Sequence, residues 1–224
     1  MKGRDKRGVA IVEFSFSMLL LVPLLIGTTA TGLNLIRTLA TVQLARDAGH
    51  MYARGVDFSQ PGNKTILATV GSNLDLSTTA GQGSAVIILS TITYVDKALC
   101  ASAGKVDGSG NPLGCTNYTK WVFTQRITIG KSSIRSSSFG SPVTTGGTPV
   151  TVNSTTGSIS VNDQATNTGD VATFAVGINP YANVNGTVSG LPSGQVIYVS
   201  EAASSGLALP PFVPSGLVYS YAMF

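Results

Sequence analysis

The stretch KRGVAIVEFSFSMLLLVPLLIG, residues 6–27, decides how this chain is organised. A short basic segment leads into an apolar run, and no charged residue occurs from Phe14 to Ile36. As an α-helix this run is about 34 Å long at 1.5 Å per residue. The hydrocarbon core of a bilayer is about 30 Å thick. The stretch therefore predicts a transmembrane helix over about residues 14–36.

The basic residues at the start of the chain predict its orientation. Four of the first seven residues are Lys or Arg, offset only by Asp5. Basic segments beside a membrane helix stay on the cytoplasmic side. We therefore expect everything after Arg37 to lie outside the cytoplasm.

Glu13 is the one carboxylate at the start of this apolar run. An ionisable residue in a membrane segment costs roughly 2 kcal/mol or more and usually marks a function. The alternative is a glutamate that is tolerated near the lipid headgroups. A secretory signal peptide is a further alternative, because residues 27–32, GTTATG, offer small residues for cleavage. The apolar run is longer than the usual 7–15 residues of a signal peptide, and Glu13 at its start argues against that interpretation.

The helical pattern continues past the predicted membrane boundary and ends at Gly55, a typical helix stop. One helix over residues 9–55, bent at Pro23, would be apolar all round in its first half and amphipathic in its second. The second half therefore needs a surface to pack on. The apolar residues of its face recur at spacings of three and four: Leu33, Ile36, Ala40, Leu44, Ala48 and Met51.

The remainder, residues 56–224, predicts a β-rich head. A short helix is expected over residues 61–73, followed by segments rich in Val, Ile, Thr and aromatic residues. We predict an α+β fold: a long N-terminal helix followed by an antiparallel β-sheet whose buried face is covered by the amphipathic half of the helix. The expected strands are residues 84–95, 120–130, 170–178, 194–202 and a last strand within 216–224.

A polar segment separates the second and third expected strands. Of the 40 residues from 131 to 170, 25 are Ser, Thr, Gly or Asn. A segment of this composition buries little apolar surface. We therefore expect it to be an exposed insertion outside the core.

Cys100 and Cys115 flank a turn-rich loop in the predicted extracytoplasmic part. Two thiols at this spacing outside the cytoplasm predict a disulfide, which would stabilise the fold by about 3 kcal/mol. The alternative is two independent buried thiols.

The sequence offers little for catalysis or for ligand binding. The segment DGSGN, residues 107–111, resembles the opening of a calcium loop, but Pro112 and Tyr118 occupy the positions that require Gly and Glu. A tight hairpin explains the same residues. The single histidine, His50, is expected on the helix surface, and no common catalytic motif occurs. We expect no catalytic residue, no cofactor and no metal site.

Charge also argues against nucleic acid as a partner. Only 11% of the 224 residues are charged, and the net charge of +4 is concentrated in the first seven positions. This distribution of charge predicts no basic face that could bind nucleic acid.

The N-terminal motifs resemble those of a known family. A basic leader ending in Gly8, then VAIVEF and a long apolar helix, resembles the class III signal of type IV prepilins. The stretch RGVAIVEFSFSMLLLVPLLIG looks like the start of TadE-like minor pseudopilins of the tight-adherence (Flp) pilus. LATVQLARDAGHMYARG, residues 39–55, is similar to the helix end in that family. The resemblance covers residues 7–55.

The resemblance implies a processing site and a mechanism. A prepilin peptidase would cut between Gly8 and Val9, removing the leader 1–8, so that Glu13 becomes the fifth residue of the mature chain. Glu13, followed by Phe14, would then act in assembly by meeting the N-terminal amine of a neighbouring subunit. The implied partners are the peptidase, other pilin or pseudopilin subunits, the inner-membrane assembly platform and the membrane itself.

The implied protein is a single-pass component of the bacterial inner membrane with its N-terminus in the cytoplasm. Its head would lie in the periplasm or in the extracellular pilus. It would act as a minor pseudopilin or as a priming subunit that supports surface adhesion. Two other classes stay open: a static membrane-anchored adhesion protein that is neither processed nor assembled, and an exported enzyme released by signal peptidase.

Overall fold

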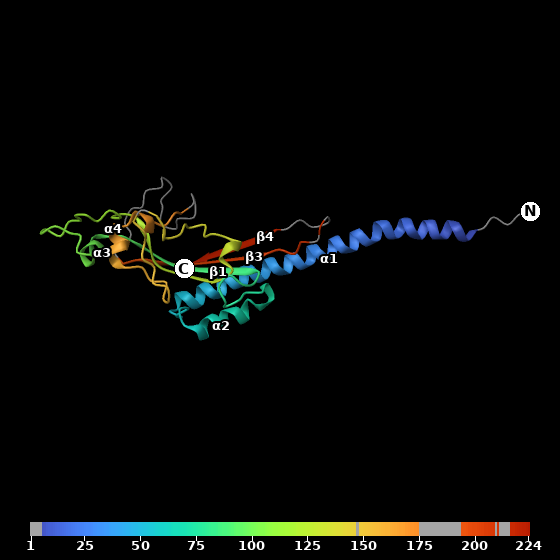
Figure 1. Cartoon of the computed structure of the whole chain (residues 1–224), viewed down its shortest axis with the longest axis horizontal. Coiled ribbons are helices and arrows are strands. Elements are labelled where there is room, and N and C mark those ends of the chain that lie inside the picture. Colours follow the sequence, from blue (N-terminus) through green and yellow to red (C-terminus); the bar gives the residue numbers. More distant parts are fainter. Residues whose placement is uncertain (1–5, 147, 175–193, 209, 211–215) are drawn as a thin grey trace, which may run out of the picture.

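A long helix projects from a β-rich head in the computed structural model, which describes residues 6–146, 148–174, 194–208, 210 and 216–224. For residues 6–10 only the backbone is described. The helix α1 (Lys6–Ala53) runs unbroken through Pro23. Figure 1 shows its N-terminal half standing clear of the head and its C-terminal half lying along the sheet.

The C-terminus of α1 is closed by a glycine, as the sequence predicts. Gly55 has a positive φ of 85°. Its N–H donates to the carbonyl of Tyr52 at 3.0 Å, and the N–H of Val56 donates to Met51 at 3.0 Å. These two bonds form a Schellman motif, in which glycine is favoured because it has no Cβ. The chain therefore reverses at Gly55 and returns along the helix as α2 (Pro61–Val70).

Four strands form one antiparallel sheet in the described part of the chain, which confirms the predicted α+β class. Their order is β2–β1–β3–β4, and β1 carries an irregularity between Thr91 and Ile92 opposite β2. The strands are β1 (Ala85–Tyr94), β2 (Trp121–Gly130), β3 (Val196–Ser205) and β4 (Leu217–Met223).

The strand expected over residues 170–178 is wrong for its described part. Asp170 ends the 3-10 helix η3 (Thr168–Asp170). The next residues bond to two different partners: Ala172 donates to Trp121 on β2, and Thr173 donates to Phe139 in the preceding segment. Because successive residues bond to different segments, this stretch forms an isolated β-bridge and no continuous strand pairing. Residues 175–178 lie outside the described residues.

One face of the sheet packs on the C-terminal half of α1, as predicted. Leu44, Ala48 and Tyr52 of α1 are buried in one cluster with Ile87 and Leu89 of β1. Alternate residues of a strand point to one face, so this spacing places both strand residues toward the helix. The core of the head therefore includes the end of α1.

The apolar face of α1 is not buried along its whole predicted length. Leu33 and Ile36 are 45% and 62% exposed, whereas Leu44 is 1% exposed. The expected helix over residues 61–73 is also shorter than predicted. Gly71 ends α2, and Ser72–Leu74 form the separate 3-10 helix η1.

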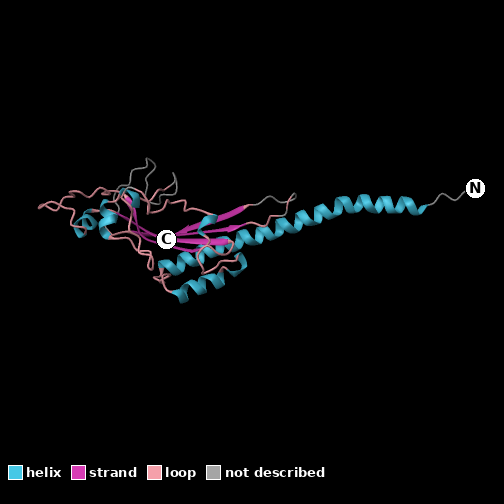
Figure 2. Ribbon diagram, viewed as in Figure 1, coloured by secondary structure: helices cyan, strands magenta, loops and turns pink. Residues whose placement is uncertain are grey.

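The other face of the sheet is covered by the polar segment 131–170, so the expectation that it lies outside the core is wrong. Phe139, Val150 and Ile159 are at most 5% exposed and pack with Phe123 of β2 and Val199 of β3. Figure 2 shows this part as loops with short helices. Those helices are η2 (Ser132–Ile134) and α4 (Val161–Thr166), followed by η3.

Hydrogen bonds to β2 explain how so polar a segment can be buried. The N–H of Arg126 donates to the carbonyl of Gly157, and the N–H of Ile159 donates to Thr124. These bonds satisfy backbone groups on the outer edge of the sheet, where an unpaired strand would otherwise be exposed. A few apolar side chains are then enough to anchor the segment.

Candidate membrane and assembly segment

The N-terminal half of α1 exposes a long apolar surface, with Glu13 near its start. Its large apolar side chains between Ile11 and Leu25 are 43–75% exposed. A soluble monomer rarely exposes so large an apolar patch. The segment reaches a mean hydropathy of 2.0 over 18 residues, none of them buried, and α1 is the one helix in the described residues that is long and apolar enough to span a membrane. The core helix of a soluble head would be buried within the chain. The apolar surface of this segment must therefore be covered by something other than its own head.

The hydroxyl groups in this apolar half bond within the helix. Ser15 donates to the carbonyl of Ile11 at 2.9 Å, and Thr31 donates to Gly27 at 2.8 Å. Thr28 likewise donates to Leu24 at 3.0 Å. A bilayer core offers no water to satisfy such groups, so internal bonding makes the hydroxyls compatible with lipid.

The predicted processing and assembly residues all lie at the start of α1. Gly8 and Val9 fall in its first turn. Glu13 lies one turn further on and is exposed, and Phe14 is 62% exposed. Among the side chains that the structure describes, no ion pair involves Glu13. The single chain therefore presents Glu13 outward, available to a neighbour.

A polar clasp, which the sequence did not predict, joins α1 to the end of β3. The side chain of Asn34 accepts from the N–H of Leu207 at 2.7 Å and donates to the carbonyl of the same residue at 3.2 Å. Arg37 donates to the carbonyl of Ser205 at 2.7 Å. Thr41 completes the clasp, because its hydroxyl is 2.9 Å from that of Ser204. The sequence signal for the clasp was the helical spacing of the polar residues Asn34, Arg37 and Thr41.

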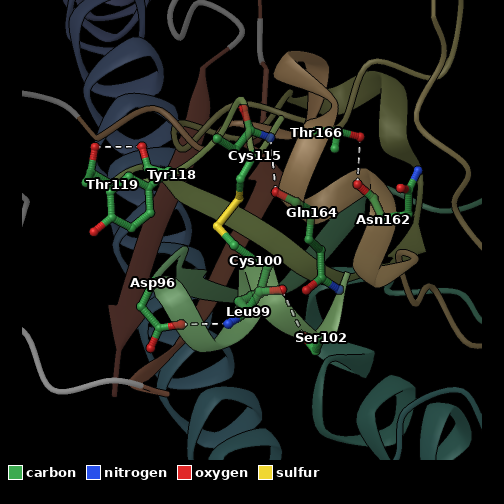
Figure 3. The surroundings of a disulfide bond; sticks show 11 residues. Asp96, Leu99, Cys100, Ser102, Cys115, Tyr118, Thr119, Asn162, Gln164 and Thr166 are labelled. Carbon is green, nitrogen blue, oxygen red and sulfur yellow. Dashed lines mark hydrogen bonds between the residues drawn. A yellow bond between two sulfur atoms is a disulfide. The ribbon is translucent and has the colours of Figure 1, made fainter. Parts of the chain in front are cut away.

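At the far end of the head, the predicted disulfide is confirmed. Cys100 and Cys115 are bonded, with their Cα atoms 5.7 Å apart. Figure 3 shows the bond between the short helix α3 (Lys97–Ser102) and the loop that approaches α4. The Asp96 carboxylate accepts from the N–H of Leu99 at 2.8 Å and so caps α3. The disulfide thus joins a capped helix to the end of the loop that follows it.

The candidate calcium loop is a hairpin. The Asp107 carboxylate accepts from the N–H groups of Ser109 and Asn111, and Val106 bridges to Pro112. These backbone bonds lower the pKa of Asp107. The described residues contain no cluster of three or more His, Cys, Asp or Glu side chains that could hold a metal.

Two further polar positions have structural partners. His50 is exposed on α1, and its ring lies 4.4 Å from that of Phe224. Tyr52 lines an open hollow at the C-terminal end of α1. Its hydroxyl lies 2.6 Å from that of Thr91 and donates to Gln125 at 2.7 Å. Burial raises the pKa of Tyr52 to about 12. This hydroxyl is therefore poorly suited to act as a general acid or general base near neutral pH.

A buried carboxylate that sequence reasoning missed fixes the polar segment to the sheet. Glu201 on β3 is 1% exposed. It accepts from the N–H of Ser138 at 2.7 Å and from the hydroxyl of Tyr219 at 2.6 Å. The hydroxyl of Ser137 donates to its other oxygen. A single charged residue inside an otherwise uncharged expected strand was the signal for this cluster.

Fold and segment together define an α+β protein whose described residues contain one candidate membrane helix, near the N-terminus. The chain matches no family model, no curated protein and no solved structure.

Proposed function

We propose that this chain is a minor pseudopilin or priming subunit of a tight-adherence (Flp) pilus or a related secretion system. The observation that carries the proposal is the division of α1. Its N-terminal half is apolar and exposed, with Glu13 near its start, and its C-terminal half is built into the head. Such a helix can hold the subunit in the inner membrane and later pack among other helices in a filament.

The mechanism is assembly rather than turnover. After cleavage between Gly8 and Val9, the new amine lies four peptide units from Glu13. In a bundle of apolar helices, the amine of one subunit meets the carboxylate of its neighbour. Removing one partner of a buried pair leaves the other uncompensated, at a cost of about 3–5 kcal/mol. One ion pair therefore sets the axial register among helices that could otherwise slide past one another.

The experiment that tests the proposal is mass spectrometry of the N-terminus of the protein recovered from cells. A mature chain starting at Val9 supports the pseudopilin. A chain starting at Met1 supports the static adhesion protein, and a start near Thr31 supports an exported protein. Gly8→Leu should leave full-length precursor, whereas the matched control Gly3→Leu should be processed normally. Unchanged processing of Gly8→Leu would refute the class III signal.

A further inference from the structure

The membrane-facing end of the head carries an apolar surface of its own. We call it the apolar collar and define it by Leu33, Leu35, Ile36 and Leu39 of α1, with Ala208 after β3 and Leu217 at the start of β4. The four helix residues are 45–62% exposed, and Leu217 is 47% exposed. Ala208 is also exposed. No charged residue occurs from Ala202 to the end of the chain.

The depth of the collar follows from the length of the helix. If Glu13 lies at the inner edge of the hydrocarbon core, a point about 30 Å further along falls near Leu33, because each residue adds about 1.5 Å. The headgroup layer occupies roughly the next 5–7 Å. Leu35, Ile36 and Leu39 then lie within or just beyond this layer, as does Arg37, whose guanidinium donates to the carbonyl of Ser205.

The polar clasp fixes the end of β3 and the adjoining Leu207 at the same depth. Both backbone groups of Leu207 are bonded to Asn34, so the neighbouring Ala208 cannot move away from the membrane without breaking those bonds. Figure 1 shows the end of β3 and the start of β4 alongside α1, on the side of the head that faces its projecting half.

The collar surrounds the clasp on both sides. Successive residues of a helix turn by about 100°, so Ile36 and Leu39 lie on the side of α1 turned away from Asn34. Ala208 and Leu217 lie on the opposite side, with the head. A second copy docked against one side would leave the other exposed, whereas a planar layer at one depth reaches both.

We propose that the apolar collar is a second membrane contact, by which Ala208 after β3 and Leu217 at the start of β4 rest in the lipid headgroup layer. This inference depends on α1 spanning the membrane, as the proposed function requires. Apolar side chains at this boundary are stabilised by partial burial among headgroups and acyl chains. The contact would hold the head at a fixed height and tilt, ready for transfer of the subunit into a filament.

The test measures lipid contact directly. Both native cysteines are disulfide-bonded, so Ala208→Cys in the full chain supplies one free thiol for an environment-sensitive fluorophore. The labelled protein is reconstituted into phosphatidylcholine vesicles with and without acyl chains brominated near the glycerol backbone. We expect brominated lipid to reduce the emission. The control is Leu113→Cys, which is 66% exposed in the disulfide loop at the far end of the head, and its emission should not change.

Two further variants separate the possible failures. Leu25→Cys reports on the span: if its emission is not quenched by lipids brominated deeper in the chain, α1 is not inserted and the proposed function fails with it. If Leu25 is quenched and Ala208 is not, the collar is refuted and the anchor stands. Disulfide-linked dimers of unlabelled Ala208→Cys without lipid quenching would assign the surface to a second copy and would also refute the proposal. Asn34→Ala, which removes the tether, should reduce quenching at Ala208 and leave Leu25 unchanged.

Discussion

Nη1 of Arg126 on β2 lies 3.8 Å from Oε2 of Glu201 on β3, across the intervening strand β1. The two side chains are 9% and 1% exposed. Burial lowers the pKa of Arg126 to about 10, and the nearby Glu201 opposes that change, so the guanidinium stays charged at neutral pH. Arg126 also donates to the carbonyl of Gly140. The pair therefore joins β2 and β3 to each other, and Arg126 also bonds to the polar segment, on the face of the sheet away from α1.

Removing the carboxylate of Glu201 should destabilise the head strongly. Glu201→Ala leaves Arg126 buried without its countercharge and the donors of Ser138 and Tyr219 without an acceptor. We expect a loss of about 3–5 kcal/mol in the free energy of unfolding. Glu201→Gln keeps an acceptor oxygen but not the charge, so it should be intermediate. The measurement is urea unfolding of the full chain in detergent, followed by the fluorescence of Trp121.

The matched control is Asp47→Ala, which removes an exposed carboxylate from α1. Surface substitutions of this kind usually change stability by less than about 0.5 kcal/mol. An unfolding midpoint for Glu201→Ala equal to that of the control would show that the buried pair contributes nothing.

Periodicity predicted the elements that bury one regular face. The helix end at Gly55 and the contact of Leu44 and Ala48 with the sheet follow from a repeat of three and four residues. The composition of the polar segment led to a wrong prediction of its burial, because an average over 40 positions hides single buried apolar residues such as Phe139. The polar clasp was missed because the helical spacing of Asn34 and Arg37 indicates a shared polar face but does not show that the end of β3 packs against it. The roles of Gly8 and Glu13 in processing and assembly remain predictions.

The head should fold only when the end of α1 is included. Leu44, Ala48 and Tyr52 belong to its core, so a fragment of residues 56–224 loses one wall of that core. We expect this fragment to be unfolded or aggregated, and residues 34–224 to fold when made under oxidising conditions. Dispersion of amide signals in two-dimensional NMR spectra distinguishes the two outcomes. Native-like dispersion for residues 56–224 would show that the helix is dispensable.

Asp170 should make the head less stable as pH rises. It is 0% exposed, and neither carboxylate oxygen has a hydrogen-bond partner among the described residues. Burial, with a smaller contribution from Asp163, raises its pKa from 3.8 to about 8, against the opposing effect of Arg126. Between about pH 4 and pH 8 the folded chain keeps a proton that the unfolded chain has lost.

The contribution of Asp170 to stability is therefore largest below pH 4 and falls by up to about 1.4 kcal/mol per pH unit until pH 8. Asp170→Asn removes this titration. The difference in the free energy of unfolding between the variant and the native chain should move in favour of the variant as pH rises from 5 to 8. A difference that stays constant over this range would mean that Asp170 is ionised in the folded head.

Glu13 offers the sharpest test of assembly, because its two explanations predict opposite results. If it is only tolerated near the headgroups, Glu13→Ala should be silent or should favour insertion, since a costly group is removed. If it pairs with the amine of a neighbouring Val9, the same change should leave cleavage and membrane insertion intact but impair assembly. The measurement is pilus recovery, or cross-linking between subunits in cells, at matched amounts of processed protein in the membrane.

Conservative variants of Glu13 separate charge from shape. Glu13→Asp keeps the charge but is one methylene shorter, so it should assemble at an intermediate level. Glu13→Gln keeps the shape but loses the ionic attraction, and it should therefore behave more like Glu13→Ala. The single chain leaves Glu13 exposed with no ion pair among the described side chains, so its loss should not disturb the fold of the head. Normal assembly of both the Ala and Gln variants would remove the physical reason for Glu13 and leave only a resemblance in sequence.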